Sequence, residues 1–432
     1  MHQPELLEPE HIPSRLRWGK LFALLPAWPE ARERVAGRKP VNRLSLVKAL
    51  VYQRLSGVRF LRDLRTRLLE QPPLLAAMGF DAYREPPSLE RFSAFLGDCP
   101  HPALQALRVA LVGELLQAGV IRGEHLGLDS CPVASWVREN NLKTSLRHRR
   151  WDKACPPAAD PDARLGVRVH YPNPDEAQVA YFWGYRHHTL ADLECELPLW
   201  EITEPNSVGE VSVALPLLQA ACAQWKLPVR SVSGDAEYDV EKILSYVVDT
   251  LHAQPFMPHN PRNAQDAQGF RRDGQAVFCP ANLPMHRHGR MTVKAITYVQ
   301  YRCPFHEGPK PELLVCPSGH PKFTAQKGCN YLWRVTENLR DRIPYGTDQF
   351  REHYNRRTAI ERVFSRLLTL TIQQPSVRGL NAVRNHCTLA HIAVLLVALA
   401  AHRFGHTNKI RFVRTYVPNF MRWLPEPKKC VL

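Results

Sequence analysis

Three carboxylates in this chain stand where a metal-binding acid can leave a strand or a helix. Asp129 ends the run His-Leu-Gly-Leu-Asp and Asp235 ends the run Ser-Val-Ser-Gly-Asp, and both runs have strand character. Glu361 completes the spacing Tyr354-x-x-Arg357-x-x-x-Glu361, which puts an aromatic ring, a cation and a carboxylate on one stripe of a predicted helix. Carboxylates are ligands that Mg²⁺ prefers, and two such ions support phosphodiester cleavage. The three acids therefore predict a two-magnesium phosphoryl-transfer site.

Each acid also has an ordinary interpretation. An acid after a strand is common in turns, and Arg357 with Glu361 would form an everyday surface ion pair if their segment stood alone. Near the second acid, Glu237 and Asp239 compete for the metal-binding role. Asp239 lies where we expect a helix N-cap, which would give it a structural function.

Taken together, the three segments resemble the DDE transposases of bacterial insertion sequences. The resemblance is to the broad group whose third acid lies in a Tyr-x2-Arg-x3-Glu-x6-Lys signature. Asp129 with its following serine is similar to the first motif of the family, and Asp235 with Tyr238 is similar to the second, Asp-x-x-Tyr. The chain departs from the signature at its last position, where Leu368 replaces the lysine. Arg366 is near but on a different side of the helix, so the DNA contact of that lysine is not carried over.

The resemblance implies a role for each residue of the motifs. Asp129 would bridge two Mg²⁺ ions, which Mn²⁺ can replace, while Asp235 would hold one ion and Glu361 the other. Tyr354 and Arg357 would contact the DNA backbone beside the metals. One site would cut at the transposon end and then join the freed 3′-hydroxyl to target DNA. The implied partners are double-stranded DNA, as terminal inverted repeats and as target, and a second copy of the chain in a homodimer that pairs two ends.

The charge of the chain favours a polyanionic partner. The formal net charge is +16, and neutralising phosphates releases condensed counterions from DNA. A basic loop after the first acid suits phosphate neutralisation combined with base stacking, although a solvated loop around a core tryptophan is the alternative. The candidate DNA-binding residues outside the helical motif are Lys143, Arg147, Arg149, Arg150, Trp151 and Tyr238.

The remaining organisation predicts an α/β protein. Apolar residues at three- and four-residue spacing predict amphipathic helices up to about Gly119, with Arg54, Arg59, Arg62, Arg65 and Arg67 mostly off the apolar stripe as a basic face or as solvated surface. Short strand-like runs, then a helix, then a strand follow, and the resemblance identifies that order as an RNase H-like catalytic core. We expect an N-terminal helical, DNA-end-binding domain at 1–120, the first part of the core at 121–259, a Cys/His-containing insertion at 260–346, the catalytic and C-terminal helices of the core at 347–405, and a basic tail at 406–432.

The insertion carries a candidate structural zinc site. Cys303 and His306 form a Cys-x2-His pair, and Cys316 and His320 form a Cys-x3-His pair, which together suit tetrahedral Zn²⁺. Further ligand types stand nearby (Cys279, His286, His288 and Cys329), and the sequence has no Cys-x-x-Cys. The alternative is a loop-rich subdomain with reduced cysteines.

The eleven cysteines are odd in number and no signal peptide precedes them, so we expect reduced thiols in a bacterial cytoplasm, with the protein at the nucleoid. The longest apolar run, 392–401, is shorter than the ~20 residues of a membrane span. We therefore expect no membrane segment and a buried helix instead.

Three other functions remain open from the sequence. The same metals could serve a nuclease without strand transfer. The chain could be an inactive or domesticated transposase that only binds DNA. The insertion could bind RNA through zinc, in which case Glu361 would be dispensable.

Overall fold

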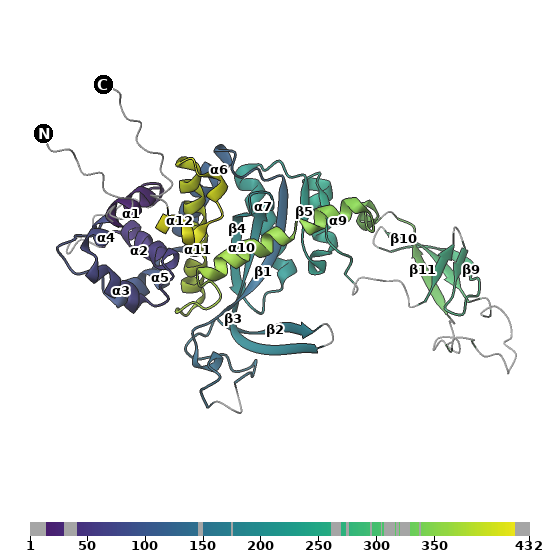
Figure 1. Cartoon of the computed structure of the whole chain (residues 1–432). Coiled ribbons are helices and arrows are strands. Elements are labelled where there is room, and N and C mark those ends of the chain that lie inside the picture. Colours follow the sequence, from purple (N-terminus) through teal and green to yellow (C-terminus); the bar gives the residue numbers. More distant parts are fainter. Residues whose placement is uncertain are drawn as a thin grey trace, which may run out of the picture. The chain divides into compact units, whose positions relative to one another are not determined.

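The computed structural model describes residues 14–29, 41–145, 150–173, 176–260, 269–273, 276–293, 296–303, 305, 316, 319, 329–336 and 338–419. The chain divides into two compact units, one comprising residues 1–256 and 351–432, the other residues 257–350 (Figure 1). Both units contain sheets, and the larger unit also holds most of the helices. The predicted α/β class is confirmed.

The larger unit is built on one six-stranded sheet. Its strands are β1 (His125–Ala134), β2 (Arg164–Asn173), β3 (Glu176–Asp192), β4 (Leu197–Pro205), β5 (Ser231–Ser233) and β6 (Gln254–Phe256). The C-terminal half of β3 lies between β4 and β1, antiparallel to both, and β1 continues in parallel to β5 and β6. Three antiparallel strands followed by two parallel ones, in the order β4-β3-β1-β5-β6, make the expected RNase H-like core.

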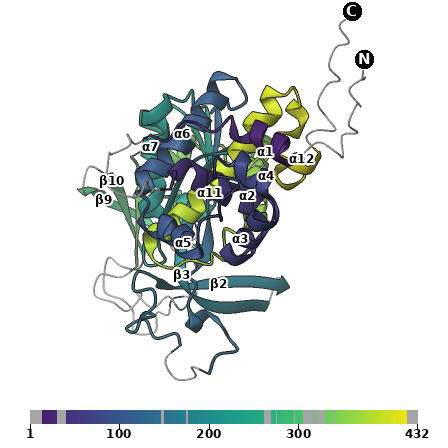
Figure 2. The ribbon, with the colours of Figure 1, turned by 90° about the vertical axis from the view of Figure 1, so that its left-hand side faces the viewer.

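The N-terminal half of β3 leaves this sheet and pairs only with β2. Figure 2 shows the two strands extending as a ribbon beyond the helices of the unit. Two cross-strand pairs on one face of the ribbon, Val167 with Tyr181 and Val169 with Val179, are each about half exposed. The ribbon therefore lies outside the hydrophobic core.

Helices pack on both faces of the sheet. The relevant ones are α7 (Glu210–Trp225), α10 (Thr358–Thr369) and α11 (Leu380–Arg403). Neighbouring residues on a strand point to opposite faces. Arg186 of β3 reaches Glu210 of α7, whereas His187 reaches His391 of α11, so α7 and α11 cover opposite faces. The third helix, α10, packs across β1 and β3 (Figure 1).

The helix α11 is the centre of the core. It is long and apolar enough to cross a membrane by length and composition, but 94% of its apolar window is buried within the described structure. It packs against β4 on one side and against the N-terminal helices α2, α5 and α6 on another. A helix with this burial is the core helix that the sequence predicted for the apolar run 392–401.

The N-terminal helices belong to the same compact unit as the sheet. They are α1 (Ser14–Phe22), α2 (Arg43–Leu55), α3 (Leu61–Glu70), α4 (Pro72–Ala77), α5 (Leu89–Asp98) and α6 (His101–Gln117). Arg54 does not lie on a basic face, because its side chain is buried and its guanidinium donates to the carbonyls of Leu50 and His386. Because α2 packs against α11, even the polar residues in the last turns of α2 are buried.

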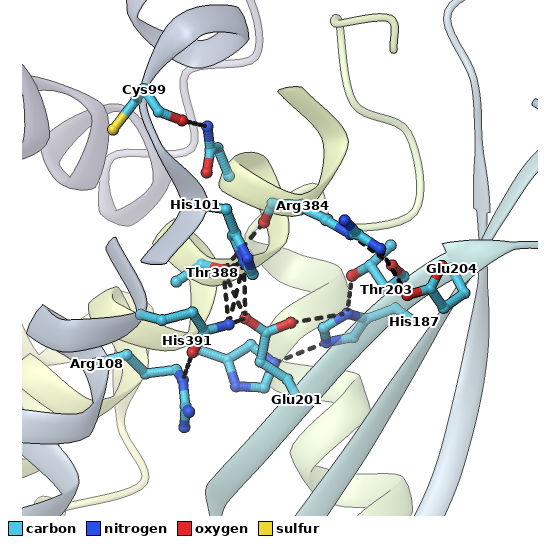
Figure 3. Close-up of polar contacts among 12 residues, drawn as sticks. Cys99, His101, Arg108, His187, Glu201, Thr203, Glu204, Arg384, Thr388 and His391 are labelled. Carbon is cyan, nitrogen blue, oxygen red and sulfur yellow. Dashed lines mark hydrogen bonds and ion pairs between the residues drawn. The ribbon is translucent and has the colours of Figure 1, made fainter. Parts of the chain in front are cut away.

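A buried polar network joins α6, the sheet and α11 (Figure 3). The carboxylate of Glu201 on β4 accepts a hydrogen bond of 2.5 Å from the Thr388 hydroxyl on α11. On β3, the His187 ring lies 2.8 Å from the ring of His391 and 2.8 Å from the hydroxyl of Thr203. Burial lowers the pKa of His187 to about 4, so this histidine is neutral at pH 7.

The smaller unit contains a three-stranded antiparallel sheet and a short hairpin. The sheet consists of β9 (His286–Val293), β10 (Ile296–Arg302) and β11 (Asn330–Arg334), and the hairpin of β7 (Arg271–Asp273) and β8 (Ala276–Phe278). Val277, Cys279, Met285, Val299 and Tyr301 form its core. In the C-terminal segment of the chain, α12 (Val413–Asn419) packs against α11 and α2.

Candidate active site

The first two acids come just beyond the residues through which β1 and β5 pair in parallel. In this pairing Gly127 lies opposite Ser233, and each acid comes two residues later in its own strand direction, as Asp129 and Asp235. Asp235 follows β5 as expected, whereas Asp129 does not end its strand, because β1 continues to Ala134 in its pairing with β3. Since parallel neighbours run in the same direction, the topology places Asp129 level with the edge at which β5 ends and Asp235 follows.

The third acid reaches this edge because α10 lies close to β1. A Cβ atom on Gly127 would lie 2.5 Å from Leu193 Cδ2 and 3.6 Å from Cβ of Ile360, the residue before Glu361. A larger residue at position 127 would displace the Leu193 side chain and crowd α10. The glycine of the Leu-Gly-Leu-Asp run thus permits the approach that places Glu361 beside the strand bearing Asp129.

Arg357 links the first and third acids. Its guanidinium lies 2.8 Å from Glu361 Oε1 and 3.8 Å from Asp129 Oδ2, and its carbon Cζ lies 5.6 Å from the ring centroid of Tyr354. The i, i+4 pair of Arg357 and Glu361 does form, as the ordinary interpretation proposed. It is not isolated, however, because the same arginine also reaches Asp129 within β1.

The helix carrying the Tyr-x2-Arg-x3-Glu spacing is interrupted, which corrects the expectation of one continuous helix. Tyr354 lies in α9 (Asp348–Asn355), Arg357 in the turn between the helices, and Glu361 in α10. At the junction the amides of Arg357 and Ile360 donate to carbonyls three residues back, and the Thr358 hydroxyl donates to the carbonyl of Asn355. These contacts compete with the i−4 bonds of a regular helix.

The electrostatics of Asp129 show that the three acids share one field. The pKa of Asp129 is raised to about 6, chiefly by burial and also by the charges of Asp235 and Glu361, while the Ser130 amide and Arg357 act in the opposite direction. The Ser130 amide donates to Asp129 Oδ1 at 2.7 Å. A carboxyl group with a raised pKa among like charges is typical of a functional site.

The residues fit Mg²⁺ by the chemistry of their donors, since all three are carboxylates. Among the residues that the structure describes, no three His, Cys, Asp or Glu side chains are grouped closely enough to hold a metal ion. Arg357 provides the positive charge between Asp129 and Glu361 in this arrangement. The side chain of Glu361 is half exposed and is held by this arginine.

Around the second acid the structure corrects the assignment of the caps. The carboxylate of Asp235 itself accepts from the amide of Glu237 at 2.9 Å and caps a short 3-10 turn. The N-cap of α8 (Glu241–Ser245) is Val240, and Asp239 precedes it as a fully buried residue. Glu237 is exposed and Asp239 is buried, so neither of these two competing acids has the partly buried environment of Asp235.

Tyr238 is a core residue and presents no surface to a DNA strand. Its ring is 1% exposed and packs where a Cβ of Gly234 would lie, 2.8 Å from Tyr238 Cδ2. Its hydroxyl donates to Glu210 at 3.3 Å. The second motif therefore needs this tyrosine to hold the turn after Asp235.

Two residues beside the first acid were missed from the sequence. Arg186 donates to the Ser130 hydroxyl at 3.3 Å and forms a close ion pair with Glu210, the first residue of α7. Arg186 and Glu210 thereby tie β3 and α7 to Ser130, the residue of β1 that follows the first acid. Alternation along β3 could have assigned Arg186 to a face, but no local pattern connects it with Glu210, 24 residues away.

The basic loop after β1 is organised by its own side chains. The guanidinium of Arg150 donates to the carbonyls of Glu139, Asn141 and Thr144, which leaves this arginine committed to closing the loop. Its expected DNA contact is thus not supported by its placement. Among the other candidates, Lys143 is exposed, the ring centroid of Trp151 lies 6.3 Å from that of Tyr181, and Arg147 and Arg149 lie outside the described residues.

The zinc prediction falls partly outside the described residues, which do not include His306 or His320. Cys303 and Cys329 are buried together in a small cluster, with Phe305 and Cys316 packed against it. Cys329 therefore lies with the two predicted cysteines. The zinc site stays a prediction.

Comparison with known proteins places the chain in a family. The family model described as "Transposase DDE domain" matches residues 166–396, more than half of the chain, including Asp235 and Glu361 but starting after Asp129. No curated protein matches the sequence. Among solved structures, the piggyBac transposase in a synaptic complex with hairpin DNA is similar at 14% identity and a TM-score of 0.38, over 97% of this chain and 83% of that one. On the family match, this chain belongs to the DDE-domain transposases.

Proposed function

We propose that the chain cleaves DNA at transposon ends and joins the freed strands to target DNA, using Asp129, Asp235 and Glu361. The observation that carries this proposal is that Arg357 lies between Asp129 and Glu361, while burial and the charges of Asp235 and Glu361 raise the pKa of Asp129 to about 6. Neighbouring carboxylates whose charges disfavour one another in this way favour a bound cation. The family supplies the reaction class, phosphoryl transfer.

In this proposal the three acids bind the metal ions and Arg357 binds the DNA phosphate. Two divalent ions, when bound, activate the attacking water or 3′-hydroxyl and stabilise the departing oxygen. Asp129, which is mostly buried, would hold both ions, while Asp235 would hold one and Glu361 the other. Arg357 would leave the carboxylates as metal neutralises them and would turn to the scissile-strand phosphate, where a guanidinium binds well. The Tyr354 ring lies below this guanidinium and limits its directions.

The surface of the larger unit offers candidate contacts for a DNA end. Arg62 and Arg65 of α3 line a pocket together with Ser88, Leu89 and Glu90 at the start of α5. Backbone amides at a helix N-terminus and arginine side chains both favour phosphate. Exposed Lys143, with its neighbours in the basic loop, would add to this surface, and paired ends would require two copies of the chain.

The test replaces each acid by its amide and follows cleavage of a labelled end in Mg²⁺ or Mn²⁺. Asp129→Asn, Asp235→Asn and Glu361→Gln are each expected to abolish cleavage while leaving DNA binding intact. Two matched controls should cleave normally. Glu352→Gln removes an exposed i, i+4 pair with Arg356, 3.1 Å long, one helix earlier, and Glu237→Gln removes the exposed acid beside Asp235.

Wild-type cleavage by any of the three amide variants would remove that residue from the site. A second assay supplies pre-cut ends and scores joined products. Cleavage without joining would make the protein a two-metal nuclease, and DNA binding with neither step would make it an inactive member of the family. Inverted repeats flanking the reading frame would support its assignment to a bacterial insertion sequence.

A further inference from the structure

We propose that Glu196 is the positioning residue that fixes α10, and through it Glu361, on the sheet. This inference rests on the proposed function and adds a residue that none of the three motifs contains. Glu196 lies in the turn between β3 and β4, 165 residues before Glu361 in the sequence (361 − 196). Its side chain is only 5% exposed.

Two arginines of α10 bind this one carboxylate. Arg362 Nε lies 2.9 Å from Glu196 Oε1, and Arg366 places one nitrogen 2.9 Å from Oε2 and another 2.5 Å from the backbone carbonyl of Glu196. Both carboxylate oxygens are thus used by a single helix. Charge-assisted bonds of this length hold a direction as well as a distance.

A third arginine comes from the C-terminal segment. Arg411 lies 3.1 Å from Glu196 Oε1 and also donates to the carbonyls of Cys195 and Glu194, at 3.2 and 2.8 Å. Three guanidiniums therefore surround one buried carboxylate. Without its charge, the three cations would repel one another and the contact between the turn and α10 would lose its attraction.

The ion pairs of Glu196 fix the rotation of α10 about its axis, which apolar packing alone does not determine. The buried face of α10 consists of Ala359, Ile360, Val363, Phe364 and Leu367, and contacts among such side chains are not directional. Arg362 and Arg366 are one turn apart on the same stripe, so bonding both to one point sets the rotation of the helix about its axis. The rotation in turn decides whether Glu361, the neighbour of Arg362, faces Asp129.

The backbone of Glu196 supports a dedicated role. Its φ of +59° lies in the left-handed region, where a residue with a side chain is strained and glycine is the usual choice. Such strain persists where the surroundings determine the conformation. A glycine here would relieve the backbone but would leave Arg362, Arg366 and Arg411 without their shared carboxylate.

The same contact accounts for Arg366, the cation nearest to the position where the signature has lysine. Its side chain is 15% exposed and donates to both the carboxylate and the backbone carbonyl of Glu196, whereas Leu368 is 41% exposed. Arg366 is therefore an anchor of the helix and is not available to a DNA backbone.

The experiment uses Glu196→Gln in the full chain, which keeps the shape and removes the charge. Hydrogen exchange of amides 358–369 should become faster while that of α11 stays at the wild-type rate, because Glu196 binds two arginines of α10 and its third arginine, Arg411, lies outside α11. The affinity for Mn²⁺ and the cleavage rate should each fall about 10- to 100-fold, the range seen when residues that orient metal ligands are changed. The KM for the DNA end should not change.

The matched control is Glu204→Gln on the same strand-and-turn unit. Glu204 of β4 pairs with Arg384 of α11 at 2.6 Å and is likewise mostly buried, but it does not touch α10. Its loss should leave the exchange of α10 and the Mn²⁺ affinity unchanged. Equal effects of the two substitutions would overturn the inference, because a general loss of stability would then explain both.

Variants on the helix keep the test decisive if Glu196→Gln does not fold. Arg362→Gln and Arg366→Gln each leave two arginines on Glu196 and should each speed exchange in α10 alone. Wild-type exchange and Mn²⁺ affinity in the folded variants would refute the positioning role. These two readouts need no cleavage, so they remain informative even if Asp129→Asn and Glu361→Gln cleave normally and the proposed function fails.

Discussion

Lowering the pH from 7 to 5 is expected to weaken Mn²⁺ binding through the protonation of Asp129. The pKa of this carboxyl group is raised to about 6, first by burial and then by Asp235 and Glu361, against the Ser130 amide and Arg357. A metal ion binds the deprotonated form. Protonation of the metal-free protein therefore competes with the metal.

The magnitude follows from the pKa. With a pKa of about 6, roughly one Asp129 in eleven is protonated at pH 7 and about ten in eleven at pH 5, so the apparent affinity should fall about tenfold, or about 1.4 kcal/mol. An unperturbed aspartate would change the affinity by less than about 10% over the same range, because it titrates near pH 4. The size of the fall in Mn²⁺ affinity therefore shows whether the pKa of Asp129 is raised.

The assay is a titration of the metal-free protein with Mn²⁺, followed by magnetic resonance or calorimetry, at pH 7, 6 and 5. Arg357→Met serves as a directional control: it removes a charge that lowers the pKa of Asp129, so its loss of affinity should begin at a higher pH than in the wild type. A Mn²⁺ affinity that stays constant between pH 7 and pH 5 would refute the assigned environment of Asp129.

Two predictions concern stability. The folded pKa of Asp129 lies above the unfolded value of 3.8, so its charge destabilises the folded state as the pH rises through this range. Asp129→Asn should therefore raise the free energy of unfolding by about 3 kcal/mol at pH 7 and by little at pH 4. Urea unfolding measures this difference. An equal gain at both pH values would contradict this account. His187 has the opposite sign: burial lowers its folded pKa to about 4, so stability should fall as pH drops below 6.5, by about 2 kcal/mol from this residue at pH 5. His187→Gln should lose less stability than the wild type between pH 7 and pH 5, and a parallel loss in both proteins would show that His187 is not the group that titrates.

The fold class could be predicted because its signals are local. Alternating and apolar runs indicated β1, β3, β4 and β5, and the long apolar period indicated α11, so the order of strands and helices followed from the chain itself. The edge shared by Asp129 and Asp235 also follows from that order once β1 and β5 are parallel neighbours. Their roles as metal ligands stay a prediction.

The hydrogen-bond partners of individual arginines could not be predicted. Arg54, Arg150 and Arg366 each have the surface-like spacing of a solvated or DNA-binding arginine, yet each is bound to carbonyl or carboxylate groups of the protein. An arginine has five donors and satisfies them wherever the fold places acceptors. The acceptors belong to His386, to the basic loop after β1 and to Glu196. Periodicity along the chain does not predict these contacts.

The distribution of arginines suggests how metal and DNA binding depend on each other. Arg366 is bound to a buried carboxylate at 2.9 Å, whereas Arg357 is held by one half-exposed carboxylate at 2.8 Å and by Asp129 only at 3.8 Å. Metal ions that neutralise Glu361 and Asp129 would remove the attraction that keeps Arg357 in place, while Arg366 would stay. In the proposed mechanism the release of one arginine, and not of its neighbours, couples metal binding to the capture of a phosphate. Arg357→Met should therefore reduce the increase in DNA affinity that Mn²⁺ produces, and an undiminished increase in this variant would show that the two binding events are coupled by other residues.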